Sequence, residues 1–167
     1  MTQQSLPLTS DITAGAILIG TPESLPLIAE LDLPLASLGE EGFLVLSKNI
    51  NGDAATVIAA NDDIGLLYGA FEYLRQVQTK QDLEQLDIAS APKIDLRVLN
   101  HWDNLDRSVE RGYAGQSIWD WWRLPAITEP RYRDYARANA SLGINGTVLN
   151  NVNAQAEVLL PRYIAKT

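Results

Sequence analysis

The sequence predicts an α/β protein in two parts: a small α+β N-terminal domain, then the first βα units of an incomplete (β/α)8 barrel. Two observations predict this fold. The first part reads as strand, helix, β-hairpin and helix, and a polar stretch separates it from a strand–loop–helix–strand pattern. The second pattern is the unit that builds parallel sheets and (β/α)8 barrels. Two strands cannot close a barrel and would leave unpaired edges, so we expect the barrel to be truncated.

The first elements are a strand, a helix and a hairpin. The apolar run Ala14–Thr21 ends in a Gly-Thr-Pro turn, as expected of a buried strand. Residues 22–33 follow with a helix-like pattern, which Pro26 would interrupt. Residues 41–61 hold two apolar runs around an Asn-Gly pair. Asn-Gly readily adopts the positive φ angles of a type I′ turn, so these runs predict a β-hairpin.

Residues 62–78 predict the main helix of the N-terminal domain. Apolar residues recur in it at helical spacing, namely Ile64, Leu67, Phe71 and Leu74. Acidic residues at its start suit the helix dipole, and either Asp62 or Asp63 would cap it. The GLLYG segment lies within this helical pattern, so it does not predict a phosphate-binding loop.

Residues 79–93 are polar and rich in turn formers, which predicts a linker between a domain at 1–92 and a second domain at 94–167. The second domain has four further predicted elements: a strand at Ile94–Asn100, a helix at Arg131–Gly143, a strand at Gly146–Asn150 and the start of another helix near the end. A long loop rich in tryptophan joins the first strand to the helix.

The composition is that of a globular protein, with 46 % hydrophobic and 20 % charged residues. The formal net charge is −8 and no basic run occurs, which argues against nucleic acid as a partner. No apolar run approaches the roughly 18–20 residues that span a bilayer, so we expect no membrane partner. No signal peptide is visible, which favours the cytoplasm, although a missing N-terminus would hide one.

The chain has no cysteine and one histidine. The absence of cysteine excludes disulfides, thiolate metal sites and cysteine nucleophiles. A single histidine argues against a histidine-based metal centre. We therefore expect neither a metal nor a cofactor.

Both predicted strands of the second domain end in polar clusters, and barrel active sites lie at such strand ends. The first cluster is Asn100-His101-Trp102-Asp103-Asn104, and the second is Asn150-Asn151-Val152-Asn153. Amides, an imidazole, a carboxylate and an aromatic ring suit a sugar, whose hydroxyls need directional partners and whose ring has an apolar face. The alternative is structural, because asparagines at strand ends often satisfy backbone groups in turns.

The long loop contains a second cluster, in which Trp119, Trp121 and Trp122 fall within four residues. We favour packing or a subunit contact over sugar stacking, since apolar burial explains such aromatics without a ligand. The charged run 103–111 predicts local ion pairs. Arg107 and Arg111 would alternatively bind a carboxylate with their planar guanidinium groups.

The segments RVLNHWDNLDRSVERGYAGQSIWDWWRLP and RYRDYARANASLGINGTVLNNVNA resemble the bacterial α-glucuronidases of xylan breakdown. The similarity runs from about Ile17 to the end and is densest from Arg97 to Ala154. It implies a glycoside hydrolase that releases glucuronic acid or its 4-O-methyl ether from glucuronoxylo-oligosaccharides. It also implies an N-terminal domain, a catalytic (β/α)8 barrel and a helical C-terminal region, absent here, through which the complete enzyme forms a homodimer.

The resemblance further implies which residues bind the substrate. The family's uronic acid pocket has an aromatic wall and an apolar contact, which match Trp102 and Val152. Their neighbours are predicted to bind substrate from their position alone: His101, Asp103, Asn104, Asn150, Asn151 and Asn153.

The resemblance implies no catalytic residue in this chain. The family inverts configuration with two carboxyl groups roughly 6.5–9.5 Å apart, and both come from later barrel strands. The chain also resembles an N-terminal domain whose start is missing, so we expect it to be truncated at both ends and inactive alone. Two alternatives to this interpretation as a hydrolase are a stand-alone carbohydrate-binding module and an assembly module without catalysis.

Overall fold

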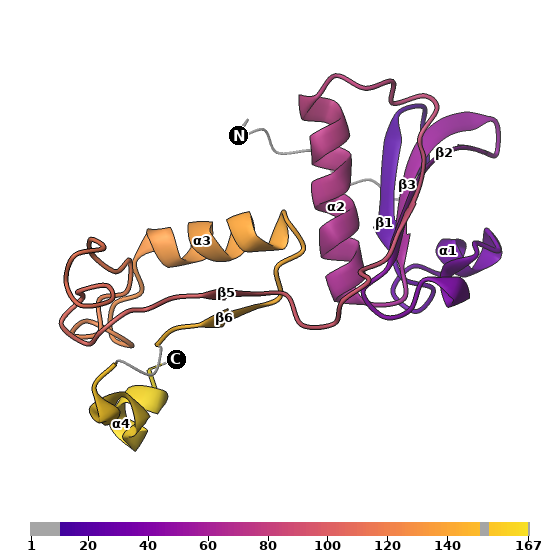
Figure 1. The fold of residues 1–167 in the computed structure, drawn as a ribbon. Coiled ribbons are helices and arrows are strands. Elements are labelled where there is room, and N and C mark those ends of the chain that lie inside the picture. The colour runs from indigo at the N-terminus through magenta and orange to yellow at the C-terminus, as the bar shows by residue number, and fades with distance from the viewer. Residues whose placement is uncertain (1–10, 151–153, 167) are drawn as a thin grey trace. The chain divides into compact units, whose positions relative to one another are not determined.

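A four-stranded sheet organises the first part of the structure, which was obtained as a computed structural model and describes residues 11–150 and 154–166 (Figure 1). The strands are β1 (Ala16–Gly20), β2 (Phe43–Ile50), β3 (Asp53–Ala60) and β4 (Asp87–Ser90). Their order is β1-β3-β2-β4. β1 and β3 are parallel, while β2 is antiparallel to both β3 and β4.

Helices cover both faces of this sheet. The short helix α1 (Pro26–Glu30) and the 3-10 turn η1 (Leu35–Ser37) lie on one face, and α2 (Asp63–Gln78) lies on the other (Figure 1). The core between the sheet and α1 with η1 includes Leu18, Ile28, Leu35, Leu44 and Val57. The core between the sheet and α2 includes Phe43, Val45, Ile58 and Tyr68. Successive strand residues point to opposite faces, so one sheet supplies two cores.

Several predicted elements are confirmed. The first strand, the hairpin and the main helix all form, and Asn51 and Gly52 have φ angles of 56° and 102°, as a type I′ turn requires. Asp62 is the residue that caps α2, because its carboxylate accepts a 2.7 Å hydrogen bond from the Gly65 amide.

Two expectations for the first part were wrong in detail. Pro26 was expected to interrupt a helix, but it begins α1 as its first residue, where a missing N–H group costs nothing. β4 was not predicted, because it lies in the polar stretch 79–93. It forms because Leu86 and Ile88 pack against the core beneath α2 while β4 pairs with β2.

Two glycines let α2 approach the sheet closely. A Cβ atom on Gly69 would lie 2.8 Å from Cγ2 of Ile58 and 3.3 Å from Cβ of Phe43. A Cβ atom on Gly65 would lie 2.7 Å from that of Ala60. The GLLYG segment is therefore a packing surface of the helix, in agreement with its interpretation as helix rather than phosphate loop.

The second part has a two-stranded parallel sheet of β5 (Val98–Asn100) and β6 (Gly146–Val148), with α3 (Pro130–Ala140) between them in sequence. A 3-10 turn η2 (Ala156–Leu159) and a short helix α4 (Pro161–Ile164) follow. The strand–loop–helix–strand order is confirmed, with shorter strands than predicted. The chain divides into two compact units, Met1–Lys93 and Ile94–Thr167, and together they form a mixed α/β structure with small sheets. In the part of the chain that the structure describes, no helix is long and apolar enough to cross a membrane.

Candidate functional site

The ends of β5 and β6 bring the two predicted polar clusters together. The backbone pairing of the strands continues past them, since the His101 amide donates to the Val148 carbonyl at 2.7 Å and the Asp103 amide to the Leu149 carbonyl at 3.3 Å. The side-chain amide of Asn150 donates to the Asp103 carbonyl. Asn150 thus joins the two strand ends. Three other predicted residues, Asn151, Val152 and Asn153, lie outside the described residues.

Asp103 is a buried carboxylate, with 2 % of its surface exposed. Its Oδ2 accepts a 2.6 Å hydrogen bond from the Ser117 hydroxyl, whose oxygen accepts the Trp119 amide at 2.9 Å. The same Oδ2 lies 3.8 Å from Nδ1 of His101. Asp103 therefore ties the end of β5 to the long loop.

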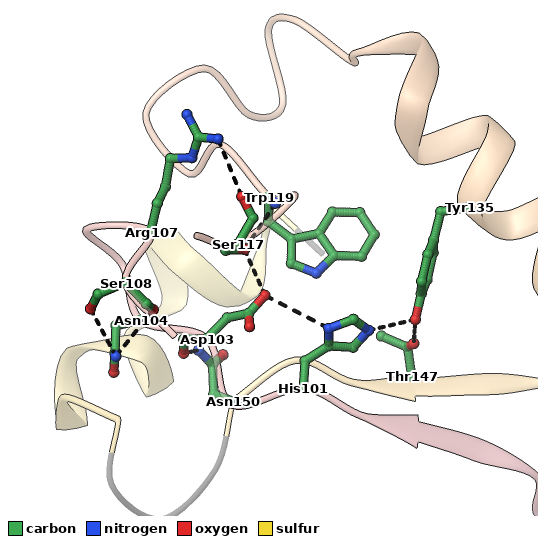
Figure 2. A network of polar contacts seen from close by, with 10 residues as sticks. All are labelled: His101, Asp103, Asn104, Arg107, Ser108, Ser117, Trp119, Tyr135, Thr147 and Asn150. Carbon is green, nitrogen blue, oxygen red and sulfur yellow. Dashed lines mark hydrogen bonds and ion pairs between the residues drawn. The ribbon is translucent and has the colours of Figure 1, made fainter. Parts of the chain in front are cut away.

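His101 continues this network toward α3 and β6. Its Nε2 lies 2.5 Å from the hydroxyl oxygen of Tyr135, which lies 2.9 Å from Oγ1 of Thr147. Figure 2 shows His101 between Asp103 and Tyr135. The imidazole ring also packs edge-on against Tyr135, with ring centroids 5.4 Å apart.

Asn104 shapes the loop after β5. Its side-chain amide donates to the Ser108 carbonyl at 3.2 Å and to the Ser108 hydroxyl at 3.1 Å (Figure 2). It also donates to the Glu110 carbonyl at 2.8 Å. Hydrogen bonds from Ser108 also lower the pKa of Asp106 below its ordinary value. These contacts match the structural alternative for strand-end asparagines, in which the side chain satisfies turn groups.

Of the two ion pairs formed by the arginines of the charged run, Arg111–Glu110 is local as predicted, whereas Arg107 pairs with Asp120 outside the run. Nη1 of Arg107 lies 4.0 Å from Oδ2 of Asp120, and Nε of Arg111 lies 3.9 Å from Oε1 of Glu110. Arg107 also donates to the Ser117 carbonyl at 3.2 Å. Arg107 and Glu110 have positive φ angles of 72° and 58°, an uncommon backbone conformation for residues other than glycine.

An open cavity of about 560 Å³ lies beside this network. Its lining includes Asn100, His101, Trp102, Asp103, Glu110, Tyr113 and Gln116. Trp102 lines the cavity and is 44 % exposed, so part of its surface is available to a ligand. Four residues of the first predicted cluster therefore line one cavity.

Glu110 is a carboxylate residue of this cavity that the sequence analysis did not predict as a site residue. Its side chain is 10 % exposed, and its Oε2 is buried without a hydrogen-bond partner among the described residues. Its Oε1 accepts a 3.3 Å hydrogen bond from Tyr113. Desolvation and the charge of Glu110 raise the pKa of Tyr113 above its ordinary value. Oε2 is thus the carboxylate oxygen of Glu110 that the protein encloses without a partner among the described residues.

The tryptophans of the second cluster differ from one another. Trp121 is 3 % exposed, and Trp119 packs against Tyr132 and Tyr135 with ring centroids 4.9 and 5.5 Å apart. These two confirm the packing interpretation. Trp122 does not, because it is 72 % exposed.

Sequence reasoning missed the partners of the site: Glu110, Tyr113, Ser117, Tyr135 and Thr147. The spacing of these residues in the sequence did not predict their contacts. The contacts depend on the path of the long loop and on which face of α3 packs toward β6. Among residues 11–150 and 154–166, no group of three or more potential metal ligands comes together.

Comparison with known families decides the chain's membership. The model described as "Glycosyl hydrolase family 67 N-terminus" matches residues 1–73, and "Glycosyl hydrolase family 67 middle domain" matches residues 76–167. The chain belongs to glycosyl hydrolase family 67. The predicted family of glycoside hydrolases is thereby confirmed.

Relatives within family 67 agree with this assignment. "Probable alpha-glucuronidase A" of Aspergillus fumigatus (strain CBS 144.89 / FGSC A1163 / CEA10) is 34 % identical over 157 residues, and the Aspergillus oryzae protein of that name is 36 % identical over 159. Both matches cover 94 % of this chain and 18 % of the relative. The chain therefore spans less than a fifth of these curated relatives. These relatives come from Aspergillus, so the bacterial source implied by the resemblance stays a prediction.

Proposed function

We propose that this chain supplies the first part of an α-glucuronidase, which hydrolyses the bond between glucuronic acid, or its 4-O-methyl ether, and xylo-oligosaccharides with inversion. One observation carries the proposal. Within a chain of family 67, the exposed Trp102 and the nearly buried Glu110, whose Oε2 has no partner among the described residues, line one cavity. Both family matches are to hydrolase domains, which does not favour a stand-alone binding or assembly module.

The cavity offers the two kinds of contact that a sugar needs. The face of Trp102 packs against the apolar face of the uronic acid ring. Oε2 of Glu110, which the protein encloses in this structure, becomes exposed on binding and accepts a hydrogen bond from one of the sugar's hydroxyls. The Tyr113 phenol holds the other oxygen of Glu110. Asn151, Val152 and Asn153 are proposed to border the same sugar, as the resemblance implies.

The architecture proposed for the whole protein follows from the second unit. β5 and β6 are parallel and flank α3 in sequence, as the first strands of a (β/α)8 barrel do. Residues 1–92 form the preceding domain, and residues 94–167 begin the barrel. The homodimer implied by the resemblance is proposed to form through residues outside this chain.

The catalytic carboxylates are also proposed to lie outside this chain. Asp103 is a poor candidate, because it is buried and its Oδ2 is already bonded to Ser117. Glu110 is assigned to binding, because one of its oxygens is occupied by Tyr113. An inverting enzyme needs two carboxyl groups on opposite sides of the scissile bond with a water between them.

Hydrolysis by the full-length protein tests this proposal. ¹H NMR of a 4-O-methylglucuronosyl xylotriose digest is expected to show the β-anomer of the free uronic acid first, because inversion converts an α-linkage into a β-product. Release of the α-anomer first, or no release of uronic acid, would contradict the proposal. Maltotriose is the matched control and is expected to stay intact.

A Glu110→Gln substitution separates binding from catalysis. It is expected to raise KM about fivefold with little change in kcat, because a charge-assisted hydrogen bond to the sugar becomes a neutral one. A general acid or base would instead lose roughly 10²–10⁴ in kcat. Asp134→Asn is the matched control, since Asp134 is 74 % exposed on α3. A loss of kcat in Glu110→Gln on that larger scale would refute the binding role.

A further inference from the structure

Three segments of the second unit meet at the imidazole of His101. Nε2 lies 2.5 Å from the hydroxyl of Tyr135 on α3, and this hydroxyl lies 2.9 Å from Oγ1 of Thr147 on β6. Nδ1 lies 3.8 Å from Oδ2 of Asp103, which accepts the Ser117 hydroxyl from the long loop. Figure 2 shows these five groups as one continuous chain of contacts.

The charge of Asp103 determines which group donates in each hydrogen bond of this network. An Nδ1 lone pair would be repelled by the carboxylate of Asp103, so the ring proton belongs on Nδ1. Nε2 then accepts from the Tyr135 hydroxyl, whose oxygen accepts from the hydroxyl of Thr147. Both ring nitrogens of His101 are thereby directed at protein groups, which leaves neither free for a ligand.

This network holds the residues that precede and follow Trp102 in the sequence. Its neighbours His101 and Asp103 are fixed by their side chains and by backbone hydrogen bonds to the end of β6. The Trp102 carbonyl accepts the Glu110 amide at 2.7 Å. An indole on a fixed backbone loses less conformational freedom when a sugar packs against it, which favours binding.

We propose that Tyr135 and Thr147 are positioning residues: through His101 they fix the backbone that presents Trp102 to the substrate. The inference rests on the proposed function, and it assigns His101 to orienting Trp102 instead of holding a sugar hydroxyl. Removal of the Tyr135 hydroxyl breaks the chain at its centre. The ring itself stays packed, since its contact with Trp119 does not involve the hydroxyl.

A double-mutant cycle in the full-length protein tests the inference. Tyr135→Phe alone is expected to raise KM for the glucuronosyl xylotriose about fivefold with kcat within twofold, as for one lost hydrogen bond. In a Trp102→Ala background the same substitution is expected to change nothing further, because Tyr135 acts through Trp102. Tyr132→Phe is the matched control. The Tyr132 hydroxyl accepts the Asp120 amide at 2.8 Å and takes no part in the contacts of His101. The change in KM caused by Tyr132→Phe is therefore expected to add to the change caused by Trp102→Ala.

A second readout reports on the hydrogen-bond chain without activity. ¹⁵N NMR of the His101 ring, identified by its loss in His101→Gln, is expected to show protonated Nδ1 and a hydrogen-bonded Nε2 whose resonance shifts in Tyr135→Phe. Protonation of Nε2 alone, an unchanged KM in Tyr135→Phe, or additive effects in the cycle would overturn the inference and leave the proposed function intact. An unaltered kcat/KM in Trp102→Ala would instead overturn the proposed function. The resonances of the His101 ring would still decide whether the hydrogen bonds from His101 to Tyr135 and Asp103 exist.

Discussion

Replacing Trp102 by alanine in the full-length protein is expected to lower kcat/KM for glucuronosyl xylotriose about 30-fold or more, because truncating a buried aromatic anchor commonly costs at least about 2 kcal/mol of binding. In the proposed complex the indole is covered by the sugar, whereas Trp102 is 44 % exposed without it. KM is expected to carry most of the change. Steady-state kinetics of uronic acid release measure both constants.

Trp122→Ala is the matched control for this substitution. Trp122 belongs to the same long loop, is 72 % exposed and does not line the cavity. Its removal is expected to change kcat/KM by less than twofold. Equal losses in the two variants would show that Trp102 has no special contact with the sugar.

Gly69→Ala is expected to destabilise the packing of α2 on its sheet by about 1–2 kcal/mol, since overpacking costs about 1–3 kcal/mol and better helix propensity returns up to about 1. The new Cβ atom would lie 2.8 Å from Ile58 Cγ2, at a buried position in the sheet. Hydrogen exchange measured by mass spectrometry should then accelerate roughly tenfold in peptides covering α2 and β3, given that each 1.4 kcal/mol of opening free energy is tenfold.

Leu74→Ala gives the comparison on the opposite side of the same helix. Leu74 is 44 % exposed, so its truncation is expected to change exchange less than Gly69→Ala does. If Gly69→Ala left exchange in α2 unchanged, the close approach of this helix to β3 would be wrong.

Much of the fold could be predicted because local physics decides it. Asn51 and Gly52 specify a hairpin turn through their tolerance of positive φ, and Asp62 specifies a helix start through its carboxylate. The buried face of α2 could not be predicted from apolar spacing. Ile64, Leu67 and Leu74 are 44–47 % exposed, while the buried residues of the helix are Gly65, Tyr68 and Gly69. The two glycines are buried because the absence of a Cβ atom lets the helix approach the sheet closely, which apolar spacing does not predict.

The candidate site was predictable only in part. Placing His101 and Asp103 at the end of a strand needs only the order of elements, and the structure puts both on one cavity. Their partners come from elsewhere: Ser117 reaches Asp103 across 14 positions of sequence, and Tyr135 reaches His101 across 34. Such contacts depend on the three-dimensional path of the long loop and on the placement of α3, which no local pattern encodes.

In the proposed function, the cavity beside β5 binds the uronic acid through Trp102 and Glu110. A crystal structure of the full-length protein with glucuronic acid bound tests it most directly. We expect a sugar ring stacked on the Trp102 indole, with one hydroxyl within hydrogen-bond distance of Glu110 Oε2. Glucuronic acid bound at a site that touches neither residue would contradict the claim.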